Sequence, residues 1–325
     1  MELAVTTLLV AILLVLFGLV IGSFLNVVIH RLPREDTKIS SGRSQCPSCH
    51  TQISARDNIP VVSWLALRGR CRHCGWRIPV RYPLVELSVP VLWLTMLWTW
   101  GAELRLVPFL WLVPVLVSAS VIDMQTMKIP KKIVWPGFVV GLILISVVSL
   151  WPDELTSVPE LFLSWGDTTR DLILHAVLGA AMYFGFLFIA WFAYPKGMGF
   201  GDVRLALVLG LYLGWIDLRL PLLGLIISSF LGAVGGVIIL LAQRSEAPAA
   251  AEPAAGDTAT TVEPTAEPTT EPGEAGADPG NDGEAGDEPT RLTKTAFPFG
   301  PWLALGTFVA IWFHHPLVCL LDRGC

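Results

Sequence analysis

Long apolar runs alternate with short polar connections along most of the chain. A helix that crosses a hydrocarbon core of about 30 Å needs about 20 apolar residues, and fewer where the bilayer is locally thin. We identify eight such runs, of which the sixth is the shortest. They cover residues 3–29, 83–100, 106–122, 133–151, 171–194, 203–216, 220–242 and 297–318. The pattern predicts an all-α polytopic membrane protein with about eight transmembrane helices.

The first apolar run is expected to stay in the protein as a transmembrane helix. A cleavable signal peptide begins with a basic stretch, which is followed by an apolar core of about 7–15 residues. This chain opens with Met1-Glu2, and its first apolar run is much longer than such a core. The sequence therefore favours a retained helix over a signal peptide.

Composition agrees with a membrane protein and argues against other classes. Apolar residues make up 53% of the chain and charged residues only 15%, whereas soluble domains carry about 25% charged residues. These values argue against a soluble enzyme, a nucleic-acid-binding domain and a disordered scaffold. The lipid bilayer is therefore an expected partner, and nucleic acid is not.

The net charge of −5 has its origin in one segment. Residues 243–296 contain 12 acidic residues, 3 basic residues and seven prolines, without apolar periodicity. Such a segment cannot bury enough apolar surface to offset the entropy lost on ordering. We expect it to form a disordered loop, and the rest of the chain to be net basic.

The distribution of Lys and Arg indicates the orientation, because basic connections stay on the cytoplasmic side. Segment 30–82 holds ten of these residues, and the connections 123–132 and 195–202 also contain Lys, whereas 152–171 is acidic. We therefore expect the three basic connections in the cytoplasm and both termini outside. The predicted organisation is a first helix (1–29), a cytoplasmic loop domain (30–82), a six-helix core (83–242), the acidic cytoplasmic loop (243–296) and a last helix with a short outer tail (297–325).

Two C-x-x-C motifs lie in the predicted loop domain, and they consist of Cys46, Cys49, Cys71 and Cys74. Four thiolates at this spacing are typical of a structural, tetrahedral Zn²⁺ site. A pair of redox-active motifs or unliganded thiols is the alternative, but reducing conditions in the cytoplasm favour metal binding. Because the loop is too small for much core of its own, the metal would supply part of its folding free energy. The remaining cysteines, Cys319 and Cys325, could pair on the outer side.

Three carboxyl groups lie at the edges of predicted spans, where ionisable residues are costly and are candidates for function. Asp123 directly follows the third run and Asp202 directly precedes the sixth, so both are expected at the cytoplasmic end of the membrane. Each alone could be a helix cap or an interface anchor, but together they predict an acid–base pair. Gly199 and Gly201 precede Asp202 and would permit positive φ and a close approach of substrate backbone. Glu86 could pair with Arg81, could anchor its helix at the interface, or could contact substrate.

Several motifs occur together in one order along the chain. They are Gly22–Pro33, the four-cysteine loop with Asn58-Ile59-Pro60 and Leu67-Arg68-Gly69, Arg81-Tyr82-Pro83 with Glu86, Ile122-Asp123, Gly199-Phe200-Gly201-Asp202 and Pro298-Phe299-Gly300-Pro301. By these motifs the chain resembles the prepilin leader peptidases, bifunctional membrane enzymes of type IV pilus and type II secretion biogenesis. The resemblance extends over nearly the whole chain except the acidic segment.

The resemblance implies an aspartic endopeptidase of the bacterial cytoplasmic membrane, with its active site facing the cytoplasm. Such an enzyme removes a basic leader from type IV prepilins or type II pseudopilins after a glycine, and then methylates the new α-amino group with S-adenosylmethionine. Matched by motif, Asp123 and Asp202 are the catalytic aspartates, and the four cysteines of the two C-x-x-C motifs are the zinc ligands. Gly199, Gly201 and Glu86 would support the substrate or the loop.

Some positions depart from the family pattern, and some alternatives stay open. Arg204 stands where lysine is usual, Lys131 stands where an acid is usual, and the acidic segment is an addition. No Gly-x-Gly-x-x-Gly motif opens a nucleotide-binding unit, so a methyl donor would bind in the cytoplasmic loop or at its junction with the helices. The alternatives are a peptidase without methyltransferase activity, a zinc-stabilised assembly protein, and a proton or cation relay, which would favour acids nearer the bilayer midplane.

Overall fold

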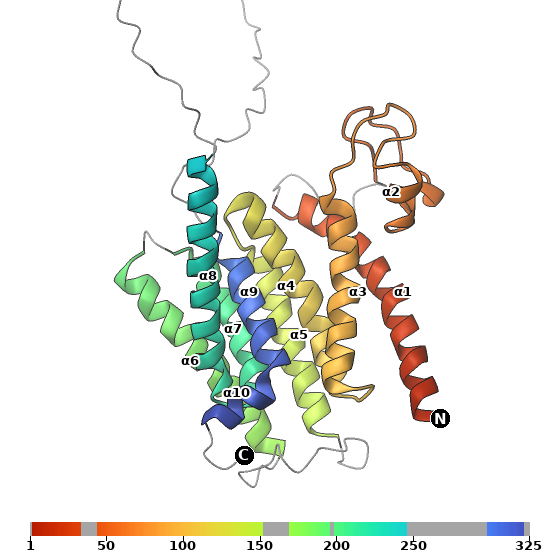
Figure 1. Cartoon of the computed structure of the whole chain (residues 1–325). Coiled ribbons are helices and arrows are strands. Elements are labelled where there is room, and N and C mark those ends of the chain that lie inside the picture. The colour runs from red at the N-terminus through yellow and green to blue at the C-terminus, as the bar shows by residue number, and fades with distance from the viewer. Residues whose placement is uncertain (1, 34–43, 152–168, 196–197, 246–297, 322–325) are drawn as a thin grey trace, which may run out of the picture. The chain divides into compact units, whose positions relative to one another are not determined.

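The computed structural model describes residues 2–33, 44–151, 169–195, 198–245 and 298–321 (Figure 1). Apart from two isolated β-bridges, the regular structure of these residues is helical, which confirms the all-α prediction. The helices are α1 (Glu2–Arg31), α2 (Val62–Ala66), α3 (Arg81–Trp100), α4 (Leu106–Thr126), α5 (Lys131–Ser149), α6 (Thr169–Ala193), α7 (Phe200–Ile216), α8 (Leu220–Ser245), α9 (Gly300–Trp312) and α10 (His314–Leu321), with a short 3₁₀ helix η1 at Ala55–Asn58.

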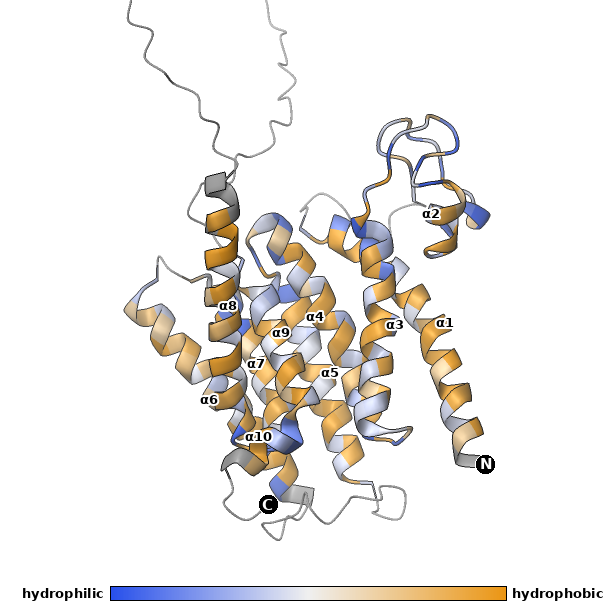
Figure 2. Cartoon of the chain, viewed as in Figure 1, coloured by the Kyte–Doolittle hydropathy of each residue, from blue (hydrophilic) through white to orange (hydrophobic). Residues whose placement is uncertain are grey.

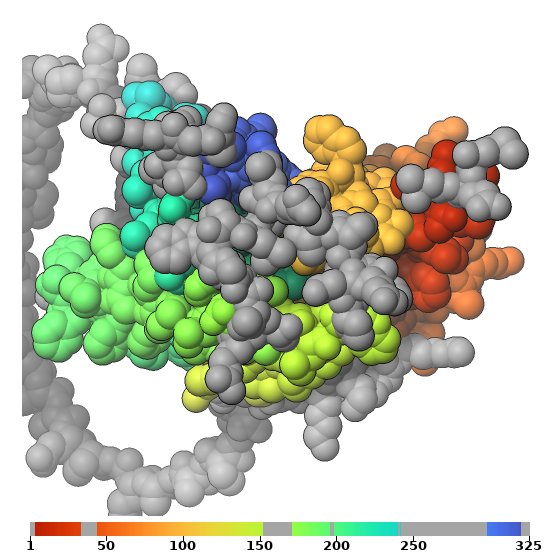
Figure 3. All heavy atoms as spheres, turned by 90° about the horizontal axis from the view of Figure 1, so that it is seen from below, coloured from red at the N-terminus to blue at the C-terminus, as the bar shows by residue number. Residues whose placement is uncertain are grey.

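Each of the eight apolar runs corresponds to a helix or to a pair of helices. Six helices, α1, α3, α4, α5, α6 and α8, are long and apolar enough to cross a membrane by length and composition. Their surfaces are largely hydrophobic, whereas the loop around α2 is much more polar (Figure 2). Seen from below the view of Figure 1, α1 lies at one edge of the helices and α6 lies at the other (Figure 3).

The short helix α7 is an interior helix. Twelve of its 17 residues are buried, and it packs against α5, α6 and α9. Small residues permit this packing, because a Cβ atom on Gly179 of α6 would lie 2.6 Å from both the Gly210 oxygen and the Gly214 Cα of α7. Glycines spaced four apart allow two helix backbones to come close in a membrane. The shortness of this run thus reflects a helix that is surrounded by protein.

A second close helix pair joins α1 to α3. A Cβ atom on Gly18 would lie 2.9 Å from the Pro90 Cα, and one on Gly22 would lie 2.7 Å from the Glu86 Cα. Gly18 and Gly22 are four residues apart and therefore lie on the same face of α1. This packing brings the end of α1 beside the start of α3, where the four-cysteine loop is attached (Figure 1).

The last apolar run, which the sequence predicts as a single span, forms two helices. Helix α9 ends at Trp312 and α10 begins at His314. Pro316 lies in the first turn of α10. Proline lacks the N–H that would bond to the carbonyl four residues earlier, and its ring clashes with that carbonyl. The single-helix prediction for 297–318 is therefore wrong.

The chain divides into two compact units. One consists of Met1–Val237 and Phe297–Cys325, and it contains all the sites described below. The other is Ile238–Ala296, which beyond Ser245 lies outside the described residues. The disorder expected for 243–296 and the partner of Cys319 at Cys325 therefore stay predictions.

Candidate functional site

Asp123 lies in the last turn of α4 and is only 5% exposed. Its Oδ2 accepts a hydrogen bond of 2.9 Å from the backbone N–H of Gly300, the first residue of α9. A Cβ atom on Gly300 would lie 2.8 Å from the same oxygen, so only glycine leaves room for the carboxyl group there. The start of α9 thus holds one acid of the predicted pair.

Asp202 lies in the first turn of α7 and is 7% exposed. The carboxyl group accepts a hydrogen bond from the backbone N–H of Gly199, the N-cap residue. This arrangement is half of a capping box, in which the third helical residue reaches back to the N-cap. The other oxygen, Oδ1, is buried and has no hydrogen-bond partner in the described part of the chain. Capping therefore accounts for only one of the two oxygens.

The structure brings the two acids together, although they are far apart in sequence. The charge of Asp123 acts on the Asp202 carboxyl group. Ile129 lies between the helix starts that carry the site, because a Cβ atom on Gly201 would lie 3.0 Å from the Ile129 Cβ and one on Gly300 would lie 3.1 Å from its Cδ1. The end of α4 and the starts of α7 and α9 thus form one buried junction.

The glycines before Asp202 act differently from our expectation. Gly199 is extended, with φ −72° and ψ 138°, and Gly201 is part of α7. Neither has positive φ. What Gly201 supplies is space for Ile129, and the expected close approach of substrate backbone stays a prediction. The expectation of positive φ is wrong at both positions.

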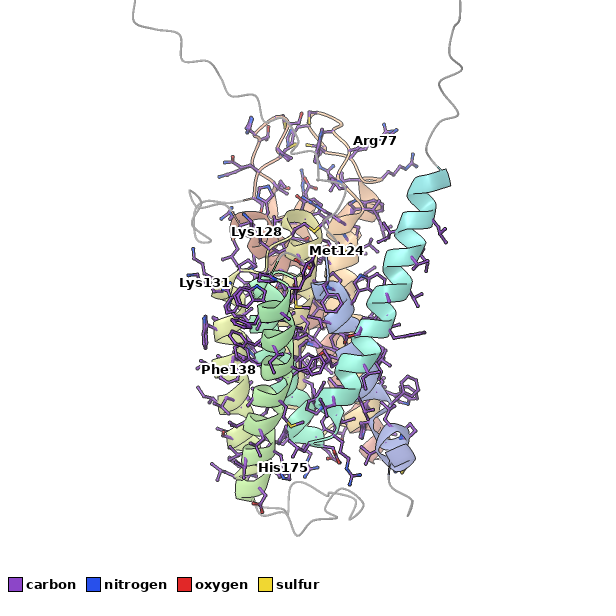
Figure 4. All side chains as sticks on the ribbon, turned by 90° about the vertical axis from the view of Figure 1, so that its left-hand side faces the viewer. Arg77, Met124, Lys128, Lys131, Phe138 and His175 are labelled. Carbon is purple, nitrogen blue, oxygen red and sulfur yellow. The ribbon has the colours of Figure 1, made fainter. Side chains whose placement is uncertain are left out.

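The acid pair lies near the basic end of the helices. Figure 4 shows Met124, Lys128 and Lys131 towards the same end as Arg77 of the four-cysteine loop, whereas His175 lies at the opposite end. Met124 follows Asp123 directly, which places the pair at this end. The acid pair therefore lies at the end of the helices that carries Lys128 and Lys131.

Glu86 connects the loop to the helices. Its Oε2 accepts a hydrogen bond of 2.7 Å from the backbone N–H of Val61, and its carboxyl group also interacts with the side chains of Ser23 and Asn26 on α1. Of the readings left open for this residue, the contacts favour support of the loop. Arg72 forms an ion pair with Asp57 and not with Glu86.

Val61 has an unusual backbone conformation at this contact, with φ 60° and ψ −48°. Positive φ is rare for a β-branched residue and costs about 1–3 kcal/mol. The bond to Glu86 holds the strained N–H in place. Asn26 adds a second tie, because its side-chain amide donates to the Tyr82 carbonyl over 3.1 Å. Strain that is held by several hydrogen bonds often marks a functional region.

The four cysteines of the two C-x-x-C motifs form one cluster, as the sequence predicted. Their sulfur atoms all lie within 4.8 Å of one another, and the Sγ atoms of Cys46 and Cys74 are 3.8 Å apart. Ligands at a Zn–S distance of about 2.3 Å in a tetrahedron are separated by about 3.8 Å. The geometry of the thiols therefore fits a bound Zn²⁺ ion.

The two C-x-x-C motifs are built by matching turns. In the first, the Cys46 N–H donates to the Thr51 carbonyl, and β-bridge partners Gln45 and Gln52 flank the turn. In the second, the Cys71 N–H donates to the Trp76 carbonyl, and Arg70 and Arg77 take the flanking positions. Each turn presents two sulfurs to the centre. The sequence did not reveal this repeat, because the two segments share little beyond the cysteines.

Local hydrogen bonds favour the thiolate form that a metal requires at two of the four cysteines, Cys49 and Cys71. Side-chain and backbone donors of Thr51 lower the pKa of Cys49 to about 6. Backbone N–H groups of Cys74 and His73 lower the pKa of Cys71. Two sulfurs, one in each turn, are thus prepared to bind a cation.

A cavity of about 760 Å³ lies between the end of α1, the four-cysteine loop and the start of α3. Its lining includes Asn26 and Val27 of α1, Trp64 of the loop and Glu86 of α3. One feature of the sequence points to this site, since Ser23 and Asn26 are polar residues on one face of an apolar helix. Val61 had no comparable signal, and Gly300 was marked only as part of the Pro298-Phe299-Gly300-Pro301 motif.

Two protein-family models match the chain, one over the region of the four-cysteine loop and the other over the region of the acid pair. Residues 16–100 match the family model described as the bacterial peptidase A24 N-terminal domain, and residues 110–237 match the model of the type IV leader peptidase family. The first match contains the cavity and the four cysteines, and the second contains Asp123 and Asp202. No solved structure matches the chain.

Full-length relatives agree with these matches. A prepilin leader peptidase/N-methyltransferase from Myxococcus xanthus is 35% identical over 91% of this chain and 88% of its own length. Proteins of the same name from Pseudomonas putida and Aeromonas hydrophila are 36% and 35% identical, over 69% and 70% of this chain and 78% and 80% of their own lengths. Together with its apolar helices, these matches show that the chain is a multi-pass membrane protein of the type IV leader peptidase family.

Proposed function

We propose that the chain is an aspartic endopeptidase that removes the basic leader from type IV prepilins or type II pseudopilins after a glycine, and that it then methylates the new N-terminus. The observation that carries the peptidase proposal is the buried junction of α4, α7 and α9. There Asp123 and Asp202 lie together, and one buried carboxyl oxygen, Oδ1 of Asp202, has no partner among the described residues.

Two carboxyl groups in one site share a proton, because both cannot ionise without strong repulsion. The ionised member takes a proton from water as the water attacks the peptide carbonyl. The protonated member donates to the carbonyl oxygen and later to the leaving nitrogen. The pair thus supplies both the base and the acid that peptide hydrolysis needs.

The hydrogen bonds suggest which acid takes which part. The Gly300 N–H donates to Asp123, which suits a carboxylate that acts as the base. The Asp202 Oδ1 meets no donor in the described residues, which suits a carboxyl oxygen that carries a proton towards substrate. Glu86 and the glycines before Asp202 hold the surrounding backbone and do not take part in proton transfer.

The charge at this end of the protein fits a substrate in the cytoplasmic membrane. Basic connections stay in the cytoplasm, so the end that carries Lys128 and Lys131 would face the cytoplasmic side of the bacterial inner membrane (Figure 4). Anionic lipids on that side attract basic segments. A basic leader would therefore collect beside the acid pair, with the apolar helix of the prepilin in the lipid bilayer.

The metal and the methyl donor belong to the N-terminal region. The four clustered cysteines would hold a structural Zn²⁺ ion, which closes the two turns on each other. S-adenosylmethionine would supply the methyl group: a bond forms from the amine nitrogen to the methyl carbon, the carbon–sulfur bond breaks with its electrons left on sulfur, and the amine proton passes to water.

Co-expression with a prepilin, followed by mass analysis of its N-terminus, tests this proposal. We expect the wild-type protein to yield a shortened chain that is heavier by one methyl group, and Asp123→Asn or Asp202→Asn to lower cleavage by at least about 1,000-fold. Asp217→Asn is the matched control, because Asp217 lies at the other end of α7, where it caps the Arg219 N–H. Cleavage by either of the first two variants at the wild-type rate would refute the acid pair.

A further inference from the structure

We infer that the four-cysteine loop rests on the lipid bilayer through one face of α2, which inserts apolar side chains at the boundary between headgroups and acyl chains while neighbouring arginines bind the phosphate groups of anionic lipids. This surface, the α2 face, consists of Ile59, Val62 and Leu65. It contains neither the acid pair nor the four cysteines. The inference does not depend on the proposed peptidase or methyltransferase activity.

The contact between Val61 and Glu86 sets the level of α2 along the helices. Val61 directly precedes α2, and its N–H donates to the Glu86 Oε2 over 2.7 Å. Glu86 is the sixth residue of α3, about 8 Å along the helix axis from its start. The Glu86 backbone in turn touches Gly22, which lies nine residues, or about 14 Å, before the end of α1. Helix α2 therefore begins at a level that falls inside the apolar runs 3–29 and 83–100.

The α2 face is apolar and is exposed. Ile59 is 48% exposed, Val62 is 57% exposed and Leu65 is 62% exposed. Residues spaced by three lie on the same side of helical turns, so these side chains form one surface. Figure 2 shows apolar residues in α2 against the more polar colours of the rest of the loop. Exposed apolar residues that gather in this way mark a site of contact with a partner or a membrane.

Hydrogen bonds fix the opposite side of α2 to the loop. Ser63 is buried, and its hydroxyl group donates to the Arg56 carbonyl over 3.0 Å and accepts the Ile59 N–H over 2.9 Å. The Trp64 Nε1 donates to the Ile78 carbonyl over 3.2 Å. These bonds hold Ser63 and Trp64 towards the loop. The α2 face is therefore held outward and cannot turn into the protein without breaking them.

The surroundings of the α2 face are strongly basic. Residues 44–85 contain six arginines, no lysine and a single acid, Asp57. Arg72 pairs with this acid. Arg56 of η1 precedes α2 and Arg68 follows it, and both side chains are exposed. Arginine near a bilayer surface is attracted by anionic lipids, so the two ends of α2 suit contact with phosphate groups.

This combination favours lipid over a protein occupant. The basic leader of the proposed substrate would be repelled by the arginines, and a second copy of the chain would bring its own arginines to the same contact. An anionic bilayer offers acyl chains to the apolar side chains and phosphate groups to the guanidinium groups. Amphipathic segments with basic borders lie in the plane of the membrane interface for this reason.

Photo-labelling from a phospholipid tests the inference in the full-length protein reconstituted into vesicles. The vesicles contain phosphatidylglycerol with a diazirine in the acyl chain close to the glycerol, and labelled peptides are identified by mass spectrometry. We expect label in the tryptic peptide 57–68. Label on α6 is the internal standard, because Ile189 and Phe192 of that helix are exposed. A labelled α6 with no label in 57–68 would overturn the inference.

Leu65→Glu should remove the apolar contact without disturbing the fold, because Leu65 is largely exposed. We expect the label in 57–68, relative to α6, to fall by more than about fivefold. Gln52→Glu is the matched control, because it adds the same charge to the loop beside the first C-x-x-C turn. An unchanged thermal midpoint in detergent would show that both variants fold. Equal labelling of wild type and Leu65→Glu would contradict the contact.

Replacement of phosphatidylglycerol by phosphatidylcholine tests the role of the arginines. We expect the label in the loop to fall several-fold in the wild type, and a variant with both Arg56→Gln and Arg68→Gln to label equally from the two lipids. Equal labelling of the wild type from both lipids would refute the binding of anionic lipid. Label that appears only after prepilin is added, or that declines as the ratio of protein to lipid rises, would assign the face to the substrate or to a second copy and overturn the inference.

Discussion

The N-terminal region and the helical core hold their carboxyl groups in opposite ways. Glu86 of the N-terminal region is half-buried, accepts several hydrogen bonds and adjoins an open cavity. Asp123 and Asp202 of the core are buried among packed helices, and Asp202 keeps one oxygen without a partner in the described residues. The first arrangement holds a loop in place, and the second leaves an acid available for reaction.

The two regions also differ in the contacts that hold their structure together. The core junction is formed by helix ends that pack through glycine contacts. The N-terminal region depends on a loop with little core, which the four cysteines and the contact between Val61 and Glu86 hold together. Conditions that weaken the loop should therefore act on methyl transfer much more than on cleavage.

Loss of the proposed metal should produce the largest difference between the rates of methyl transfer and prepilin cleavage. Cys46→Ser removes a buried thiol of the proposed zinc site that also lines the cavity, and metal binding by such loops supplies folding free energy. We expect methyl transfer to fall by about 100-fold and cleavage by no more than a few-fold, measured on one prepilin. A chelator should reproduce the effect and added zinc should reverse it. An equal loss of both activities would contradict the separation.

Gly300→Ala should lower the rate of cleavage and leave binding of the methyl donor unchanged. The new Cβ atom would lie 2.8 Å from the Asp123 Oδ2 and would displace the carboxyl group. A shift of about 1 Å in a reacting group can lower the rate by about 100-fold, so we expect cleavage to fall by about 10–100-fold while binding of the methyl donor is unchanged. Gly185→Ala is the control, because nothing lies within 4 Å of its Cβ position. Unchanged cleavage would show that Gly300 does not position the acid.

Gly22→Ala should act more weakly, and on the N-terminal region. Its Cβ atom would lie 2.7 Å from the Glu86 Cα, which belongs to a helix backbone and cannot easily move aside. Such overpacking costs about 1–3 kcal/mol. We expect a lower thermal midpoint and binding of S-adenosylmethionine that is weaker by several-fold, with Gly185→Ala again as control. Full binding by the variant would show that this helix contact does not shape the cavity.

The smallest effect is expected for the exposed ion pair of the loop. Hydrogen bonds from Arg72 lower the pKa of Asp57 from its usual value to about 2. Because the pKa is lower in the folded protein, the pair contributes its stability above about pH 4, and loses it as the pH falls towards 2. Exposed pairs contribute little, so Asp57→Asn should lower the thermal midpoint at pH 7 by no more than about 4 °C. A larger shift would mean that the pair has a structural role beyond its charge.

The sequence predicts the helices, the cysteine cluster and the pairing of the two acids, because each has a local signal. Run length identifies the spans, spacing identifies the thiols, and equal depth brings Asp123 and Asp202 to the same level. The break at Pro316 also had a signal in the proline itself. Each of these signals comes from the residues of a single run or a single motif, even where the features they predict join distant segments.

The features that the sequence could not predict come from packing between distant segments. Gly300 lies 177 residues after Asp123, and no local pattern says that α9 begins beside the end of α4. Positive φ at Val61 contradicts the preference of its residue type, and the Val61 N–H donates a hydrogen bond to Glu86, which lies 25 residues further along the chain. Gly199 does not adopt positive φ, because it is the extended N-cap residue of α7, and of the two glycines before Asp202 only Gly201 packs against Ile129.

Methyl transfer by the Asp202→Asn variant tests the central claim, that the two activities have separate sites, most directly. The substrate is a pilin that already lacks its leader and begins with a free phenylalanine, so no cleavage is required. We predict transfer of a methyl group from S-adenosylmethionine within about threefold of the wild-type rate, together with no measurable cleavage of intact prepilin. Loss of transfer in parallel with cleavage would contradict the account.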